Sequence, residues 1–124
     1  MSLPTELKYT RDHEWIATDG NLSTIGVTAH AADALGDVVY LDLPAVGTTT
    51  KAGEACGEIE STKSVSDLFA PADGEVVEIN EAVVADPGLV NSDPFGAGWL
   101  FRMRITGEPD LLDATGYTAL IEGA

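Results

Sequence analysis

The amino groups of lysine are the most distinctive chemical groups of this sequence, because 124 residues include only three lysines, Lys8, Lys51 and Lys63. Lys63 follows Ser61 and Thr62, lies between two segments that alternate like strands, and interrupts an otherwise acidic region. This pattern predicts a hairpin tip that presents one primary amine. A carrier needs its attachment atom on such a protrusion, although an ordinary solvated lysine at a turn would have the same local sequence.

The residues around this lysine favour access to it. Ser61, Thr62 and Ser64 are small, so a modifying enzyme and later partners could reach the amine of Lys63. Glu60 and the other acidic residues around the tip are interpreted as recognition features for that enzyme and for basic partner surfaces. They are not interpreted as catalytic acids, because charge pairs at an exposed rim act mainly on association rates.

The thiol and the imidazoles predict no further chemistry. Cys56 falls inside a predicted strand without a recognisable base beside it, so we expect a buried, inert thiol. His13 lacks a second histidine four residues later, and two isolated imidazoles, His13 and His30, do not make a zinc site. We therefore expect neither a catalytic thiol nor a metal site.

The charge balance limits the partners. Six Lys plus Arg against 21 Asp plus Glu give a net charge of -15 and a pI near 4.1. Nucleic acid and anionic membrane surfaces would repel such a chain, whereas basic protein surfaces would attract it. The single cysteine does not call for an oxidising compartment, and the N-terminal residues do not resemble a signal peptide. We expect a bacterial cytoplasmic protein, with a mature mitochondrial matrix form as the alternative.

The elements that must position Lys63 show a period of two. In residues 99–105, alternation places Trp99, Phe101, Met103 and Ile105 on one face, as in a half-buried strand. In residues 38–43 the same rule places Val39, Leu41 and Leu43 together. Further strands are predicted at 14–18, 22–27, 56–61, 64–69 and 75–80.

Short strands separated by glycine and proline signals favour a sandwich or barrel, with two helical pieces added. Thr28 could cap a short helix whose packed side presents Ala31, Ala34 and Leu35. A terminal helical segment, at about 108–122, is expected to dock on the sheet through the apolar residues Leu111, Leu112, Tyr117, Leu120 and Ile121. Without a linker or low-complexity segment, residues 1–124 are interpreted as one domain.

The Lys63 region resembles a known family. The run 60–63, followed by Ser66 and Asp67 and then by residues 70–76, is similar to the lipoylation hairpin and return strand of glycine cleavage H proteins. Segments 13–15, 26–31, 35–39, 43–44, 89–95 and 98–99 resemble family segments in the same order, so nearly the whole chain is covered. Thr62, Ala29 and Ala34 depart from the residues common in the family.

The resemblance implies a mainly β, flattened barrel sandwich of the lipoyl/biotinyl type and a protein that catalyses nothing itself. It implies lipoate joined to Lys63 as an amide by a lipoyl/octanoyl transferase or a lipoate ligase. The P protein, a pyridoxal-phosphate decarboxylase, would load the aminomethyl group of glycine onto the dithiolane. The T protein would pass the carbon to tetrahydrofolate, and the flavin-dependent L protein would reoxidise the dithiol by thiol-disulfide exchange.

The loaded arm is expected to fold back against the body of the protein. An aminomethyl adduct loses its amine to water if exposed, and its ammonium seeks carboxylates. We interpret Glu14 and Asp67 as the residues that receive it, with His30 nearby. The alternative is that these are ordinary surface residues.

Other lysine-bearing carriers fit less well. A lipoyl module of a 2-oxo acid dehydrogenase usually has an acidic residue before its lysine, and a biotinyl carrier has methionines on both sides, whereas Thr62 and Ser64 occupy those places here. A lipoyl reservoir or relay for other lipoate-dependent complexes, such as 2-oxo acid dehydrogenases, stays open because it would use the same tip. A small enzyme, or an interaction domain without a cofactor, is the alternative from another class.

Overall fold

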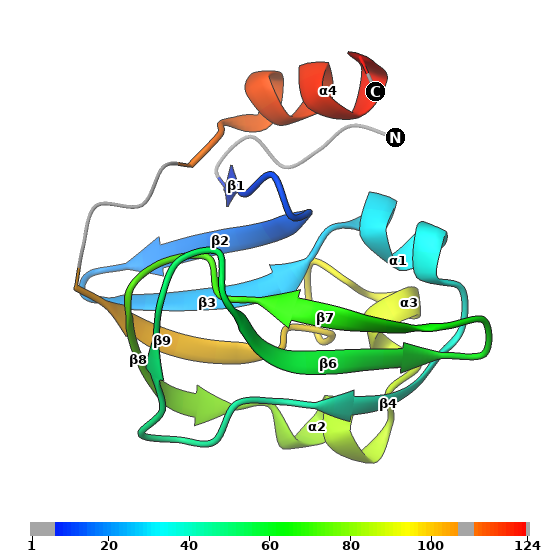
Figure 1. The fold of residues 1–124 in the computed structure, drawn as a ribbon, viewed down its shortest axis with the longest axis horizontal. Helices are drawn as coiled ribbons and strands as arrows, with labels where there is room; N and C mark the ends of the chain where they lie inside the picture. Colours follow the sequence, from blue (N-terminus) through cyan, green and yellow to red (C-terminus); the bar gives the residue numbers. More distant parts are fainter. Residues whose placement is uncertain (1–6, 107–110, 124) are drawn as a thin grey trace.

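A computed structural model describes residues 7–106 and 111–123 as two β-sheets with short helices around them (Figure 1). The larger sheet has the strand order β1-β2-β3-β9-β8-β5, and the smaller has the order β4-β6-β7. The strands are β1 (Lys8–Tyr9), β2 (Glu14–Asp19), β3 (Leu22–Val27), β4 (Val38–Asp42), β5 (Thr49–Thr50), β6 (Ala55–Ser61), β7 (Val65–Phe69), β8 (Gly74–Ile79) and β9 (Phe101–Ile105). The helices are α1 (Ala29–Leu35), α2 (Glu81–Ala85), α3 (Leu89–Ser92) and α4 (Ala114–Gly123).

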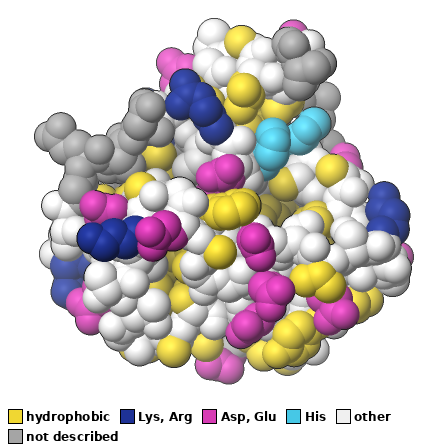
Figure 2. All heavy atoms as spheres, in the orientation of Figure 1, with side chains coloured by type: hydrophobic (Ala, Val, Ile, Leu, Met, Phe, Trp, Pro, Cys, Tyr) yellow, Lys and Arg dark blue, Asp and Glu magenta, His cyan; other side chains and the backbone are white. Residues whose placement is uncertain are grey.

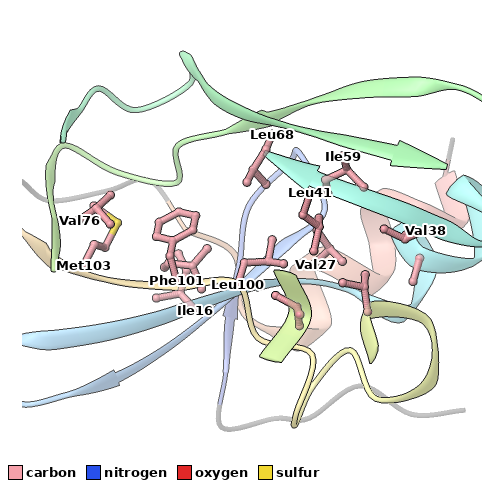
Figure 3. Packing of buried hydrophobic residues seen from close by; sticks show 14 of the residues in the cluster. Ile16, Val27, Val38, Leu41, Ile59, Leu68, Val76, Leu100, Phe101 and Met103 are labelled. Atoms are coloured by element: carbon pink, nitrogen blue, oxygen red, sulfur yellow. The ribbon is translucent and has the colours of Figure 1, made fainter. Parts of the chain in front are cut away.

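The core lies between the sheets. Figure 3 shows Leu41, Ile59 and Leu68 of the smaller sheet pointing toward Val27 and Leu100, and all five side chains are buried. Burying one such side chain contributes about 1.5–3 kcal/mol. The apolar faces of both sheets therefore hold β6 and β7, and the turn between them, against the rest of the molecule.

The predicted mainly β sandwich is confirmed, and its seven predicted strands correspond to β2, β3, β4, β6, β7, β8 and β9. The strand predicted at 99–105 begins only at Phe101. The two-residue strands β1 and β5 are too short to show alternation, and the helices α2 and α3, of five and four residues, are too short to show a helical period, so none of them was predicted. The single domain over 1–124 stays a prediction, since residues 1–6, 107–110 and 124 lie outside the described ones.

The face predicted for β4 is wrong. Val39 was expected beside Leu41, but Val39 is 51% exposed, whereas Val38 and Leu41 are both buried. The cause is a register shift, in which Val38 pairs with Ser61 and Tyr40 with Glu60, so that Val39 is an extra residue on β4. Such a bulge interrupts strict alternation.

The helix after residue 28 is confirmed, and two of the three residues predicted on its packed side, Ala31 and Leu35, pack against the core. Thr28 is the N-cap, and its Oγ1 accepts a hydrogen bond from the amide of Ala31 at 3.2 Å. Ala32 is the buried residue of α1, while Ala34 is exposed. In a helix this rich in alanine, several faces are about equally apolar, so the sequence does not select one.

The terminal helix is shorter than predicted. Residues 107–110 are outside the described part, and Leu112 is extended, because its backbone exchanges two 2.7 Å hydrogen bonds with Tyr9 of β1. Helix α4 begins at Ala114, after the Asp113 carboxylate accepts a hydrogen bond from the amide of Gly116. Tyr117 is fully buried and stacks on Tyr9 with 5.0 Å between ring centroids, so α4 docks beside β1 (Figure 1).

Candidate functional site

The structure places Lys63 in the turn between β6 and β7, at the projecting end of the hairpin, as predicted (Figure 1). The amide of Ser61 donates to the carbonyl of Ser64 at 2.8 Å, and Ser61 Oγ accepts from the amides of Lys63 and Ser64 at 3.2 Å each. Thr62, Lys63 and Ser64 are exposed, whereas Ser61 is buried. Ser61 therefore holds the turn in shape, and its three neighbours face solvent.

A second set of contacts fixes the turn to the body. The amide of Thr62 donates to the carbonyl of Asp37 at 3.0 Å, in the segment joining α1 to β4. Asn91 of α3 holds that segment, because its Nδ2 donates to the Gly36 carbonyl at 2.8 Å and its Oδ1 accepts from the Val38 amide at 2.9 Å. No role was predicted for Asn91, and its place in a segment that resembles the family was the only signal in the sequence.

Glu14, at the start of β2, is almost completely buried with 1% exposure. Its carboxyl accepts hydrogen bonds from Thr10 Oγ1 at 3.2 Å and from the backbone N–H of Phe69 in β7. Burial, and then the negative charge of Asp12, raise the pKa of Glu14 to about 8, although those two hydrogen bonds act in the opposite direction. Glu14 is therefore predominantly neutral at pH 7 and connects the two sheets.

His30 is exposed on the first turn of α1 and faces His13, with 5.0 Å between ring centroids. The two histidines lie side by side on the face shown in Figure 2. The Tyr117 hydroxyl hydrogen-bonds His13 Nδ1 at 2.7 Å and Thr28 Oγ1 at 2.8 Å. Burial, followed by the proximity of His30, lowers the pKa of His13. Helix α4 thus supports the start of α1, a contact between residues too distant in sequence to predict.

The exposed acidic residues lie in rows across the smaller sheet. Asp67 pairs with Glu58, which pairs with Asp42. One row nearer the tip, Glu60 lies between Tyr40 and Val65. These acidic residues are exposed, and Figure 2 shows acidic side chains over this part of the molecule.

In the part of the chain that the structure describes, the three residues predicted to border the cleft, Glu14, Asp67 and His30, are not joined by direct bonds. Other residues link them. None of the hydrogen bonds or ion pairs among the described residues joins Glu14 to Asp67 or His30. Glu14 meets β7 at Phe69, two residues after Asp67, and follows His13, whose ring faces His30. The structure thus places Glu14 in contact with β7 two residues from Asp67, and next in sequence to the histidine that faces His30.

Cys56 lies on β6 and is half-buried against the core, less enclosed than predicted. Burial, and then the proximity of Glu14, raise the pKa of its thiol to about 12. The reactive thiolate is therefore scarce at neutral pH. Among residues 7–106 and 111–123, no three metal-ligating side chains gather in one place, and no helix is long and apolar enough to cross a membrane.

The two-sheet sandwich with its projecting hairpin has the fold of the lipoyl/biotinyl class of domains. The sequence model described as "Glycine cleavage H-protein" matches residues 7–123. The chain therefore belongs to the glycine cleavage H-protein family, the lipoyl proteins that carry the aminomethyl group in the glycine cleavage system without catalysing a reaction.

Individual relatives agree. The glycine cleavage system H protein of Beutenbergia cavernae is 60% identical over 123 residues, covering 99% of both chains. That of Streptomyces coelicolor is 62% identical over 122 residues, covering 96% of this chain and 97% of the relative. The crystal structure of a glycine cleavage system H protein from Mycobacterium marinum superposes with a TM-score of 0.91 at 48% identity, covering 98% of this chain and all of that one.

Proposed function

We propose that Lys63 is the residue that bears lipoate, as an amide of its Nζ, in this aminomethyl carrier. The observation that carries the proposal is the tip itself, where an exposed primary amine lies between the exposed residues Thr62 and Ser64. These neighbours leave room for the active site of a lipoyl/octanoyl transferase or a lipoate ligase. When attached, lipoate supplies the dithiolane that accepts the aminomethyl group. The protein determines where the arm is attached and which residues surround its end.

The partners of the proposed cycle are the P protein, which loads the arm, the T protein, which unloads it, and the L protein, which reoxidises it. Each must reach the end of the same arm, so an attachment point on a projecting hairpin suits all three.

The test is glycine–CO2 exchange with purified P protein, comparing lipoylated and unmodified chain. Exchange that is equally fast with both forms would contradict the proposal, and intact mass shows which form is present.

Glu14, Asp67 and His30 are proposed to border the place where the loaded arm rests. Glu14 is buried and contacts β7, the strand that carries the exposed Asp67. Together they would partly exclude water and pair with the ammonium of the aminomethyl group. Because Glu14 is predominantly neutral below about pH 8, an arriving cation would favour its ionised form, and Glu14 would release its proton as the arm docks.

Loss of this pairing should shorten the life of the loaded protein. We expect Glu14→Gln and Asp67→Ala to keep lipoylation but to release the amine about tenfold faster without T protein, since each loses one charge-assisted hydrogen bond, which contributes roughly 1.5–3 kcal/mol. The control is Asp42→Ala, which removes an exposed carboxylate from the opposite edge of the same sheet. The measurement is the decay of the loaded mass with time. Decay at the wild-type rate in both variants would show that the adduct is protected elsewhere.

The acidic rows are proposed to attract basic partner surfaces. Rates with P or T protein at subsaturating carrier should then fall as salt is raised through about 0.2 M, where the screening length is below about 8 Å. Glu60→Gln, beside the tip, should reduce this salt dependence, whereas Glu122→Gln on α4 removes the same charge elsewhere and should not. A salt profile that is flat for the wild type would contradict electrostatic attraction.

A further inference from the structure

The side chain of Lys63 lies across the backbone of Gly36, the residue that ends α1. A Cβ added to Gly36 would fall 2.9 Å from Cε of Lys63, 3.7 Å from its Nζ and 3.8 Å from its Cδ. Gly36 also has φ +80° and ψ -160°, a backbone conformation that residues with a side chain rarely adopt. The end of the lysine stem therefore rests on the body of the protein at a point where a methyl group on residue 36 would displace it.

The position of this contact is fixed from two sides. Asn91 holds the carbonyl of Gly36 and the amide of Val38 in place. The bond from the Thr62 amide to the Asp37 carbonyl then ties the hairpin turn to the same segment. These bonds hold the backbone of the turn and the surface at Gly36 in one connected unit, so the stem of Lys63 starts from a fixed position beside Gly36.

We propose that Gly36 is a positioning residue, whose missing side chain forms a seat that turns the stem of Lys63 toward α1. The inference deepens the proposed function and rests on lipoylation of Lys63. Gly36 lies at one end of α1 and His30 on the first turn at the other. Seven helical residues rise only about 10 Å, a distance that a lysine stem with an attached lipoyl chain can span. The seat directs the arm along α1 toward His30 and Glu14.

The test compares Gly36→Ala with Gly53→Ala. Gly53 also has a positive φ, +81°, but a methyl group there would meet no atom within 4 Å, so both variants place a side chain at a positive φ and only one displaces the lysine. We expect both variants to have a lower thermal midpoint than the wild type. We expect the loaded form to decay about tenfold faster in Gly36→Ala only, because displacement of a positioned group by about 1 Å can cost up to a hundredfold. Equal decay in the two variants would overturn the proposal.

Two further measurements keep the result decisive. In the unmodified wild type, nuclear Overhauser contacts should join the backbone of residue 36 to the Lys63 side chain and should be lost in Gly36→Ala; their absence from the wild type would overturn the seat. If Gly36→Ala does not fold, Asn91→Asp serves instead, because it keeps the acceptor for Val38 but loses the donor to Gly36. It should speed the decay, and unchanged decay would overturn the proposal. Lack of lipoate on wild-type Lys63 would refute the proposed function, while the Overhauser experiment would still test the seat.

Discussion

Lys63→Arg is expected to abolish lipoylation and, with it, all glycine–CO2 exchange supported by the P protein, while the fold is retained. Arginine keeps the positive charge, but its guanidinium stays protonated and cannot take the place of the acylated amine. Lys63 is exposed at a turn held by the backbone and by Ser61, so its replacement should leave the core intact.

The measurement is intact mass after expression with active lipoylation, followed by the exchange assay and a thermal melt. Lys51→Arg is the matched control, since Lys51 is also exposed but lies outside the hairpin, and it should be lipoylated like the wild type. A lipoyl group found on Lys8 or Lys51 of the Lys63→Arg protein would contradict the assignment.

Glu14→Gln should remove a large pH dependence of stability. The pKa of Glu14 is about 8 in the folded chain against 4.5 as its ordinary value, so between these pH values the folded protein binds more protons at this site than the unfolded chain. The contribution of Glu14 to the free energy of unfolding is therefore fully present below pH 4.5 and is lost as pH rises through about 8. At pH 7 the loss amounts to about 3 kcal/mol, since one pKa unit corresponds to about 1.4 kcal/mol.

Glutamine resembles the neutral carboxyl in size and keeps an oxygen for the hydrogen bonds from Thr10 and Phe69. We expect the variant to have a free energy of unfolding close to that of the wild type near pH 4.5 and a higher one near pH 8. Urea unfolding of both proteins across this pH range gives the difference between their free energies of unfolding. The contributions of the other carboxylates cancel in this difference. A difference that does not change with pH would mean that Glu14 ionises normally in the folded chain.

Much of the fold could be predicted because its longer strands alternate. Local rules predicted the buried face of β9, which carries Phe101 and Met103, and the N-cap of α1 at Thr28. Both predictions are confirmed. The exposure of the Val39 side chain was not predicted, because a bulge depends on how the strand pairs with its neighbour, and local periodicity does not specify that pairing. Leu112 was assigned to a helix because its hydrogen bonds to Tyr9, far away in the sequence, leave no local pattern.

The candidate site also has features that the local sequence predicts and features that it does not. A lone lysine among small residues between two strands predicts a hairpin tip, and the structure has one there. The almost complete burial of Glu14 could not be predicted, because it results from β7 lying over the start of β2. Gly36 and Asn91 are isolated residues in sequence, and only the assembled fold brings Gly36 under Lys63 and Asn91 against Gly36.

The two edges of the smaller sheet have a consequence for aggregation. Edge strands β4 and β7 could pair with strands of other molecules, since their outward backbone groups are unpaired by neighbours in the sheet. On β4 the extra residue Val39 breaks the regular spacing that an incoming strand would need. On β7 the backbone N–H of Phe69 already donates a hydrogen bond to the carboxyl of Glu14. Together with a net charge of -15, both features oppose edge-to-edge association, so the exposed Val39, Tyr40 and Val65 can stay at the surface of a carrier that must remain dispersed.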